Sequence, residues 1–198
     1  MALITRTFKF LDTKTFLTLY KSLIRPHLEY CSPVWNKNLK YLSDEIEKVQ
    51  KLATRYIYNL RGLEYSDRLK SLNLPTLKYR RLREDIICLF RFCKTEILKN
   101  SLVEFRPNVG TRGHNLALAK KRLHTKPGRE FLLNRIIRVW NDFPENFGLI
   151  GDLNSLKKFI ENYFMSAVVK FDYCAPLEAG VAVGVGCVAA ARDEMERG

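Results

Sequence analysis

The sequence predicts a mainly α-helical protein with one basic, non-helical insertion and a tail of different composition. Apolar residues recur at helical spacing before residue 99 and again over 129–164. Glycine and proline interrupt that period in between, and alanine, glycine and valine dominate the end of the chain. We divide the chain into a helical region (1–99), a basic loop or linker with a candidate short strand (100–128), a C-terminal helical pair (129–165) and an unrelated, low-order tail expected to be disordered (166–198).

The net charge is strongly positive and unevenly distributed. The 198 residues carry a net charge of +13, and 46% of them are apolar, which is enough for a buried core and too much for a disordered chain. Residues 1–165 hold 31 Lys and Arg against 16 Asp and Glu, a net of +15, whereas 166–198 hold 3 against 5, a net of −2. A basic excess of this kind favours a polyanionic partner. A solvated, lysine-rich surface is the alternative that charge alone leaves open.

The first helical segment begins after Asp12, a candidate N-cap. Pro26 lies inside the apolar pattern and lacks the amide hydrogen that a helix interior needs, so we expect a kink or a break there. We expect Pro33 to end the segment, with Trp35 packed just beyond it. Two separate helices joined by a tight turn are the alternative.

Capping signals delimit the next helices. Asp44 and Glu47 have the spacing of a capping box, and Gly62 is expected to stop the helix that they begin. A short helix follows over 66–72, and Thr76 opens the longest helix, which reaches about residue 98. The buried stripe expected for the helix that begins at Asp44 comprises Ile46, Val49, Ala53, Ile57 and Leu60, whereas Lys48, Lys51 and Arg55 lie off that stripe.

The remaining elements follow the glycine- and proline-rich insertion. Residues 115–123 alternate well enough between apolar and polar to predict a short strand. Helical spacing returns at Arg129 and ends before Pro144, and Asn154 is expected to cap a last amphipathic helix.

The cysteine pattern and the N-terminus bear on the cellular environment. The five cysteines are scattered without a CxxC pair, and the three histidines complete no zinc-finger spacing, which predicts reduced thiols in an intracellular protein without a metal. Charged residues interrupt any signal peptide. The apolar run 179–191 has 13 residues, fewer than the roughly 20 that span a bilayer, so we expect no membrane segment. Nucleus and cytoplasm both stay open.

Patterns typical of enzymes are missing from the sequence. It contains no GxxxxGK[ST] phosphate loop, no HExxH and no GxSxG. The paired acids Glu84 and Asp85 lie beside Arg80, Arg81 and Arg83, where intrahelical ion pairing is the expected role. We therefore predict no catalytic residue, no cofactor and no small-molecule substrate for this chain alone.

Basic residues interleaved with aromatic ones are the functional signal that the residues themselves carry. They cluster in 78–83, 111–129 and 134–140. Lys and Arg neutralise phosphates, and His or Tyr can stack on bases. Tyr79 and Trp140 fit a core better, and a histidine or a lysine run on the surface is equally compatible with idle solvation. The candidate nucleic-acid-binding residues are Lys78, Arg80, Arg81, Arg83, Arg112, His114, Lys120, Lys121, Arg122, Lys126, Arg129, Arg135 and Arg138.

The order of several motifs is more specific than any one of them. The series is LDTKTFLTLYKSLIRPHLEYCSPVWN, IEKVQKLATRYI, YSDRLKSLNLPTLKYRRLRED, TRGHNLALAK, RVWNDFP and NSLKKFIENY. It resembles the C-terminal region, comprising the thumb and the helical segment after it, of jockey-like non-LTR retrotransposon reverse transcriptases, over about residues 8–164. The resemblance implies a thumb-like helical bundle, a parent RNA-directed DNA polymerase, and a role in gripping the template–primer duplex.

The sequence departs from that family in two ways. No Asp-Asp pair occurs, so we expect the catalytic palm with its Mg²⁺ ligands, the fingers and the endonuclease to be absent. The tail after residue 165 has no counterpart in the family and is interpreted as read-through into flanking sequence. The expectation is a truncated fragment, inactive as a polymerase on its own, that binds RNA, DNA or an RNA–DNA hybrid without sequence specificity and lacks its upstream palm as a partner. Two alternatives stay open: a basic RNA- or DNA-binding module reused by the host, and an inert remnant with exposed apolar faces.

Overall fold

The chain folds as an assembly of helices in the computed structural model, which confirms the predicted mainly α class. The structure describes residues 6–7, 12–36, 40–96, 103–106, 114–120, 124–125, 128, 131–164 and 170–175. Its named elements are α2 (Thr13–Leu19), the π-helical turn η1 (Tyr20–Ile24), α3 (Arg25–Glu29), α4 (Ser32–Trp35), α5 (Lys40–Thr54), the 3-10 turn η2 (Tyr58–Leu60), α6 (Tyr65–Leu72), α7 (Leu77–Lys94), α10 (Leu132–Asn141), the 3-10 turn η3 (Glu145–Leu149) and α11 (Leu153–Tyr163).

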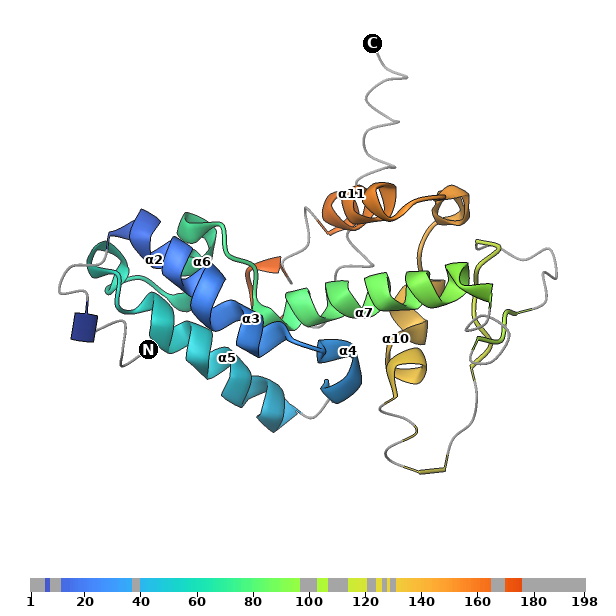
Figure 1. The fold of residues 1–198 in the computed structure, drawn as a ribbon, viewed down its shortest axis with the longest axis horizontal. Helices are drawn as coiled ribbons and strands as arrows, with labels where there is room; N and C mark the ends of the chain where they lie inside the picture. The colour runs from blue at the N-terminus through green and yellow to red at the C-terminus, as the bar shows by residue number, and fades with distance from the viewer. Residues whose placement is uncertain are drawn as a thin grey trace, which may run out of the picture.

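The structure has two hydrophobic cores, one beyond the N-terminal end of α7 and one that extends along α7. Figure 1 shows α2, α5 and α6 beyond the beginning of α7, and α10 and α11 beside α7. The first core is enclosed by α2, η1, α5 and α6, with the stacked rings of Phe16 and Tyr20 at its centre, 5.6 Å apart. The second lies between α7, α10, η3 and α11 and is rich in aromatic side chains, such as Trp140 and Phe147 with ring centroids 4.8 Å apart. Complete burial of a phenylalanine side chain such as Phe16 or Phe147 contributes about 1.5–3 kcal/mol relative to leaving it exposed.

The chain stays helical through Pro26, where a kink or a break was expected. The Arg25 amide donates to the Tyr20 carbonyl five residues back, which makes a π-helical turn directly before the proline. This wider turn accommodates a ring that would clash with the carbonyl four residues earlier in a regular helix. The break comes at Cys31, which has a left-handed φ of 51°. Pro33 lies in the first turn of α4, so it begins a helix instead of ending one.

The capping predictions are confirmed where the signal is local. The Asp12 side chain accepts from the Thr15 amide at 3.4 Å, and Thr76 accepts from the Tyr79 amide at 3.1 Å. At the last helix, Asp152 and not Asn154 is the N-cap.

The second predicted helix differs at both ends. It begins at Lys40, so Asp44 lies inside it and forms no capping box with Glu47. It ends at Thr54, and the chain then continues through turns and η2, with Ile57 buried in the first core.

The basic insertion contributes little regular structure in the parts that are described. Instead of a strand over 115–123, an isolated antiparallel bridge joins Phe105 to Leu118. Two backbone hydrogen bonds of 2.8 Å flank the bridge, from Arg106 to Ala117 and from Ala119 to Glu104. Residues 121–123 lie outside the described residues.

Part of the predicted tail packs against the helices. The Thr76 amide donates to the Lys170 carbonyl at 2.9 Å, and the Tyr173 hydroxyl donates to the Asp44 carboxylate. Residues 170–175 thus differ from the low-order tail that composition predicted, because their carbonyl groups and Tyr173 find partners at the beginning of α7 and on α5. Residues 166–169 and 176–198 lie outside the described residues. None of the helices in the described residues combines the length and the apolar character needed to cross a bilayer.

Candidate nucleic-acid interface

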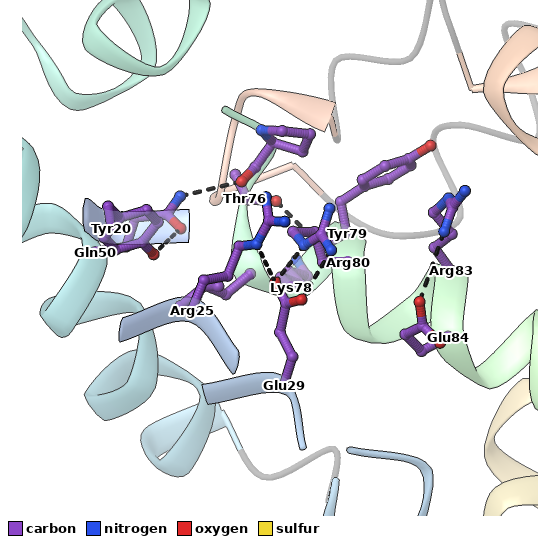
Figure 2. A network of polar contacts seen from close by, with 12 residues as sticks. Tyr20, Arg25, Glu29, Gln50, Thr76, Lys78, Tyr79, Arg80, Arg83 and Glu84 are labelled. Carbon is purple, nitrogen blue, oxygen red and sulfur yellow. Dashed lines mark hydrogen bonds and ion pairs between the residues drawn. The ribbon is translucent and has the colours of Figure 1, made fainter. Parts of the chain in front are cut away.

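Arg80 on α7 holds α3 in place. Its guanidinium forms two hydrogen bonds with the Glu29 carboxylate, one of them 2.8 Å from Nη2 to Oε2. Figure 2 shows Glu29 between the Arg80 and Arg25 side chains, and the Arg25 Nε lies 3.8 Å from the same carboxylate. Arg80 therefore directs its charge at an internal partner.

Its neighbours on α7 are also engaged within the fold. Arg81 is buried and donates to the Ser43 hydroxyl at 2.6 Å. Arg83 lies 3.6 Å from Glu84 and 3.4 Å from Glu161 on α11. Lys78 donates to the carbonyls of Tyr173 and Ala175, at 3.3 and 2.7 Å, and burial lowers the pKa of its ammonium group. The basic run at 78–83 thus joins α7 to other parts of the chain.

Arg135 on α10 makes the most buried ion pair described. Its Nε and Nη2 lie 2.9 and 2.7 Å from the two Asp85 oxygens, and the two side chains are 3% and 4% exposed. The intrahelical pairing expected for the acids of α7 is thus found for Glu84 with Arg83, whereas Asp85 pairs with α10. Asp85 could not be assigned that partner from the sequence, because it lies 50 residues away.

Glu47 forms the polar centre where α5, α6 and α7 meet. One of its oxygens accepts from the Tyr65 hydroxyl at 2.6 Å and from the Leu77 amide at 3.3 Å, and the other accepts from the Lys78 amide at 3.3 Å. The carboxylate thereby caps the N-terminus of α7 from a different helix, which the helix dipole favours. Burial raises the pKa of this carboxyl group, although the hydrogen bonds oppose the shift.

His114 is buried against aromatic rings and does not lie on the surface as a base-stacking contact. Its Nε2 donates to the Trp140 carbonyl at 2.8 Å, and its ring centroid lies 4.9 Å from that of Phe147. The Nδ1 atom has no hydrogen-bond partner among the described residues. Burial lowers the pKa of the imidazole, so the neutral ring is the form that the fold favours.

The remaining candidate nucleic-acid-binding residues are either exposed or lie outside the described residues. Lys120 and Arg138 are exposed. The Asn141 side chain exchanges hydrogen bonds of 2.8 and 2.9 Å with the Leu118 backbone, which ties the segment before Lys120 to the end of α10. The candidates outside the described residues are Arg112, Lys121, Arg122, Lys126 and Arg129. Tyr79 and Trp140 are buried, as their sequence context favoured.

A basic and aromatic surface lies at the end of α5, where sequence reasoning selected no site. It consists of Lys51, Arg55, Tyr58 and Arg61, and we call it the α5–α6 basic surface. All four residues are exposed, and Tyr58 is 77% exposed. The Arg61 guanidinium lies over the Tyr58 ring, 5.5 Å from its centroid. The sequence signal that identifies this surface is the absence of any acidic residue between Glu47 and Glu64.

Arg68 adds a buried positive charge beside this surface. Its guanidinium donates to the Thr54 hydroxyl at 3.2 Å and to the carbonyls of Leu63 and Lys51 at 2.9 and 3.5 Å. These bonds satisfy carbonyl groups near the end of α5 and hold the loop before α6. Burial lowers the pKa of Arg68, and the nearby charge of Arg55 lowers it further.

The described residues contain no group of three or more His, Cys, Asp or Glu side chains arranged to hold a metal ion. Of the described cysteines, Cys31 and Cys174 are exposed, Cys88 is half-buried and Cys93 is buried. The described residues therefore form a helical scaffold with cations at its surface and within it.

Comparisons with known proteins give a short, partial likeness. No protein family matches the chain, and no solved structure matches it. Over 80 residues the chain is 30% identical to an uncharacterized protein of Caenorhabditis elegans. The match covers 39% of this chain and 40% of that protein, so the chain spans less than half the length of the curated relative that it matches. The name of that relative states no activity.

Proposed function

We propose that this chain is a thumb-like part of a retrotransposon reverse transcriptase and that it binds nucleic acid without sequence specificity. The observation that carries the binding part of the proposal is the net charge of +15 over residues 1–165. A net positive charge of this size attracts polyanions, and binding gains affinity by releasing the counterions of the phosphates. The motif order quoted above supports the family, and the helical fold is compatible with it.

The distribution of acids in the fold strengthens the electrostatic argument. Glu29, Glu47 and Asp85 are directed at internal partners and are buried or half-buried, so they neutralise little of the outer surface. Among the residues that the structure describes, no carboxylate forms an ion pair with these exposed cations: Lys14, Lys21, Lys51, Arg55, Arg61, Lys94 and Lys120.

The test is binding of the full chain to fluorescently labelled single-stranded RNA, duplex DNA and an RNA–DNA hybrid at several salt concentrations. The full chain is used because residues 170–175 pack on α5 and α7. We expect affinity to fall steeply with salt, with a slope of about −0.7 to −0.9 per phosphate contact, and to vary little with sequence. A folded, monodisperse protein that binds none of the three at low salt would contradict the proposal.

A further inference from the structure

We propose that the α5–α6 basic surface is a binding site for single-stranded nucleic acid, with Tyr58 as the platform on which a base stacks. Lys51, Arg55 and Arg61 would contact the phosphates on either side of that base. The inference rests on the proposed function and deepens it, because it names the site and the strand state that the site takes.

The position of Tyr58 is fixed by the residues around it. Ile57 is 1% exposed in the first core, and Leu60 packs against the same core, so the exposed tyrosine stands between two anchored residues. The η2 turn and the hydrogen bonds that Arg68 donates to Leu63 and Lys51 hold this loop. An aromatic ring held in this way loses little freedom when a base stacks on it.

The exposure of the ring favours a base as its partner. Tyr58 is 77% exposed even with Arg61 over it, so a large part of the ring is open to solvent. Stacking of bases on aromatic rings and on arginine guanidinium groups is the usual way in which proteins bind single strands. Bases within a duplex already stack on one another and offer no free face, which is why the surface fits a single strand.

The charge around the ring favours phosphate. Lys51 lies in the last turn of α5 and Arg55 directly follows the helix, and both are exposed. The buried guanidinium of Arg68 lies close behind them, where carbonyl and hydroxyl oxygens and no carboxylate accept its hydrogen bonds. The charge of Glu64 acts on Arg68 in the opposite direction to burial, and Glu64 is the first acidic residue after this surface in the sequence. With Glu64 as the nearby acid, these cations and Arg61 leave a net positive charge in this part of the chain.

The experiment measures binding of the full chain and its variants to a labelled 20-nucleotide single-stranded RNA and to a DNA hairpin duplex. Tyr58→Ala is expected to weaken single-strand binding roughly 5- to 150-fold, the effect of losing one stacked base, and to change duplex binding much less. Tyr58→Phe keeps the ring and should retain the affinity. Tyr30→Ala is the matched control, because Tyr30 is also 77% exposed but lies after α3.

The charges are tested by a second pair of variants. One double variant combines Lys51→Gln with Arg55→Gln. The control double variant combines Lys14→Gln with Lys21→Gln and removes the same number of positive charges, from α2 and η1. The first double variant should reduce the salt slope by about 1.4, at roughly 0.7 per phosphate contact with a single strand, and the control should change it much less. Circular dichroism of each variant confirms that the fold is kept.

Each outcome decides the matter. If the wild-type chain binds and Tyr58→Ala binds equally well, the inference is overturned and the proposed function stands. If the folded wild-type chain binds no nucleic acid, both are overturned. If anionic phospholipid vesicles displace the RNA and bind in a Tyr58-dependent manner, the surface is a membrane site and the inference is likewise overturned.

Discussion

Asp85 and Arg135 form a buried ion pair in which Oδ1 and Nη2 are 2.7 Å apart, and this pair joins α7 to α10. Arg135 also donates to the Pro33 carbonyl at 2.8 Å, and Asn36 donates to Asp85 at 3.3 Å. The segment around α4 therefore meets both helices at one point. A cation that the sequence offered as a phosphate contact instead connects elements that lie far apart in the chain.

Arg135→Ala is expected to lower the free energy of unfolding by about 3–5 kcal/mol, because it leaves the Asp85 carboxylate buried without its charge partner. Chemical denaturation checks the change. The double variant with Asp85→Ala should lose less than the two single variants together, since it removes both charges. A loss below about 1 kcal/mol for Arg135→Ala would contradict a structural role for the pair.

Glu47→Ala is expected to lower the free energy of unfolding by roughly 2–4 kcal/mol, because the Tyr65 hydroxyl and the Leu77 and Lys78 amides lose their acceptor. The expected loss is smaller than the summed contribution of three hydrogen bonds to a charged group, because burial of the Glu47 carboxylate opposes its ionisation. Glu45→Ala is the matched control, since Glu45 is exposed and pairs with Lys48 on the surface. An equal loss of unfolding free energy in both variants would show that Glu47 contributes no more to stability than an exposed glutamate.

The contrast between Thr76 and Glu47 shows which parts of the fold could be predicted from sequence. A side-chain cap such as that of Thr76 involves residues three apart, so a short pattern contains all of its information. Glu47 has the spacing of a capping residue as well, but its partners lie 18 and 30 residues along the chain. No local pattern distinguishes these two uses of the same spacing.

The same limit explains why the sequence alone did not reveal which of the candidate binding residues are engaged within the fold. The basic run that contains Arg80 predicts affinity for anions, and its anion turns out to be Glu29, 51 residues away. His114 was expected in a solvated loop, yet aromatic rings from α10 and η3 enclose it. Tyr58 was overlooked because helical periodicity continues past the point where α5 ends. What sequence did provide is the overall excess of positive charge.

Arg80→Ala is expected to reduce stability and to leave nucleic-acid binding nearly unchanged. The variant removes a charge-assisted pair with Glu29, which contributes about 1–3 kcal/mol in a half-buried position. Thermal unfolding and RNA binding measured on the same samples separate the two effects. Lys94→Ala, at the exposed end of α7, is the control for the loss of one positive charge. A large drop in the salt slope for Arg80→Ala at unchanged stability would show that Arg80 faces the ligand.

Charge reversal of Lys120, Lys121 and Arg122 together is expected to weaken nucleic-acid binding and flatten its salt dependence. Each phosphate contact contributes about 0.7–0.9 to the slope, so losing all three should reduce it by about 2 or more. Lys120 is exposed, so its replacement leaves the core intact. Binding measured over a salt series provides the test, and an unchanged slope would show that these three residues do not contact the phosphates.

His114→Gln is expected to reduce the loss of stability that the wild-type chain shows between pH 7.5 and pH 5.5. Burial lowers the pKa of the folded imidazole, so below the unfolded pKa of about 6.5 the unfolded chain binds a proton that the folded chain excludes. The contribution of the neutral ring is therefore complete above pH 6.5 and is lost as pH falls toward the lowered pKa. Glutamine keeps a donor for the Trp140 carbonyl and carries no titrating group. Thermal unfolding of both proteins over this range gives the comparison: the difference in Tm between wild type and variant should shrink or reverse as pH falls. A difference that stays constant would mean that His114 accepts a proton equally well in both states, against its burial between Trp140 and Phe147.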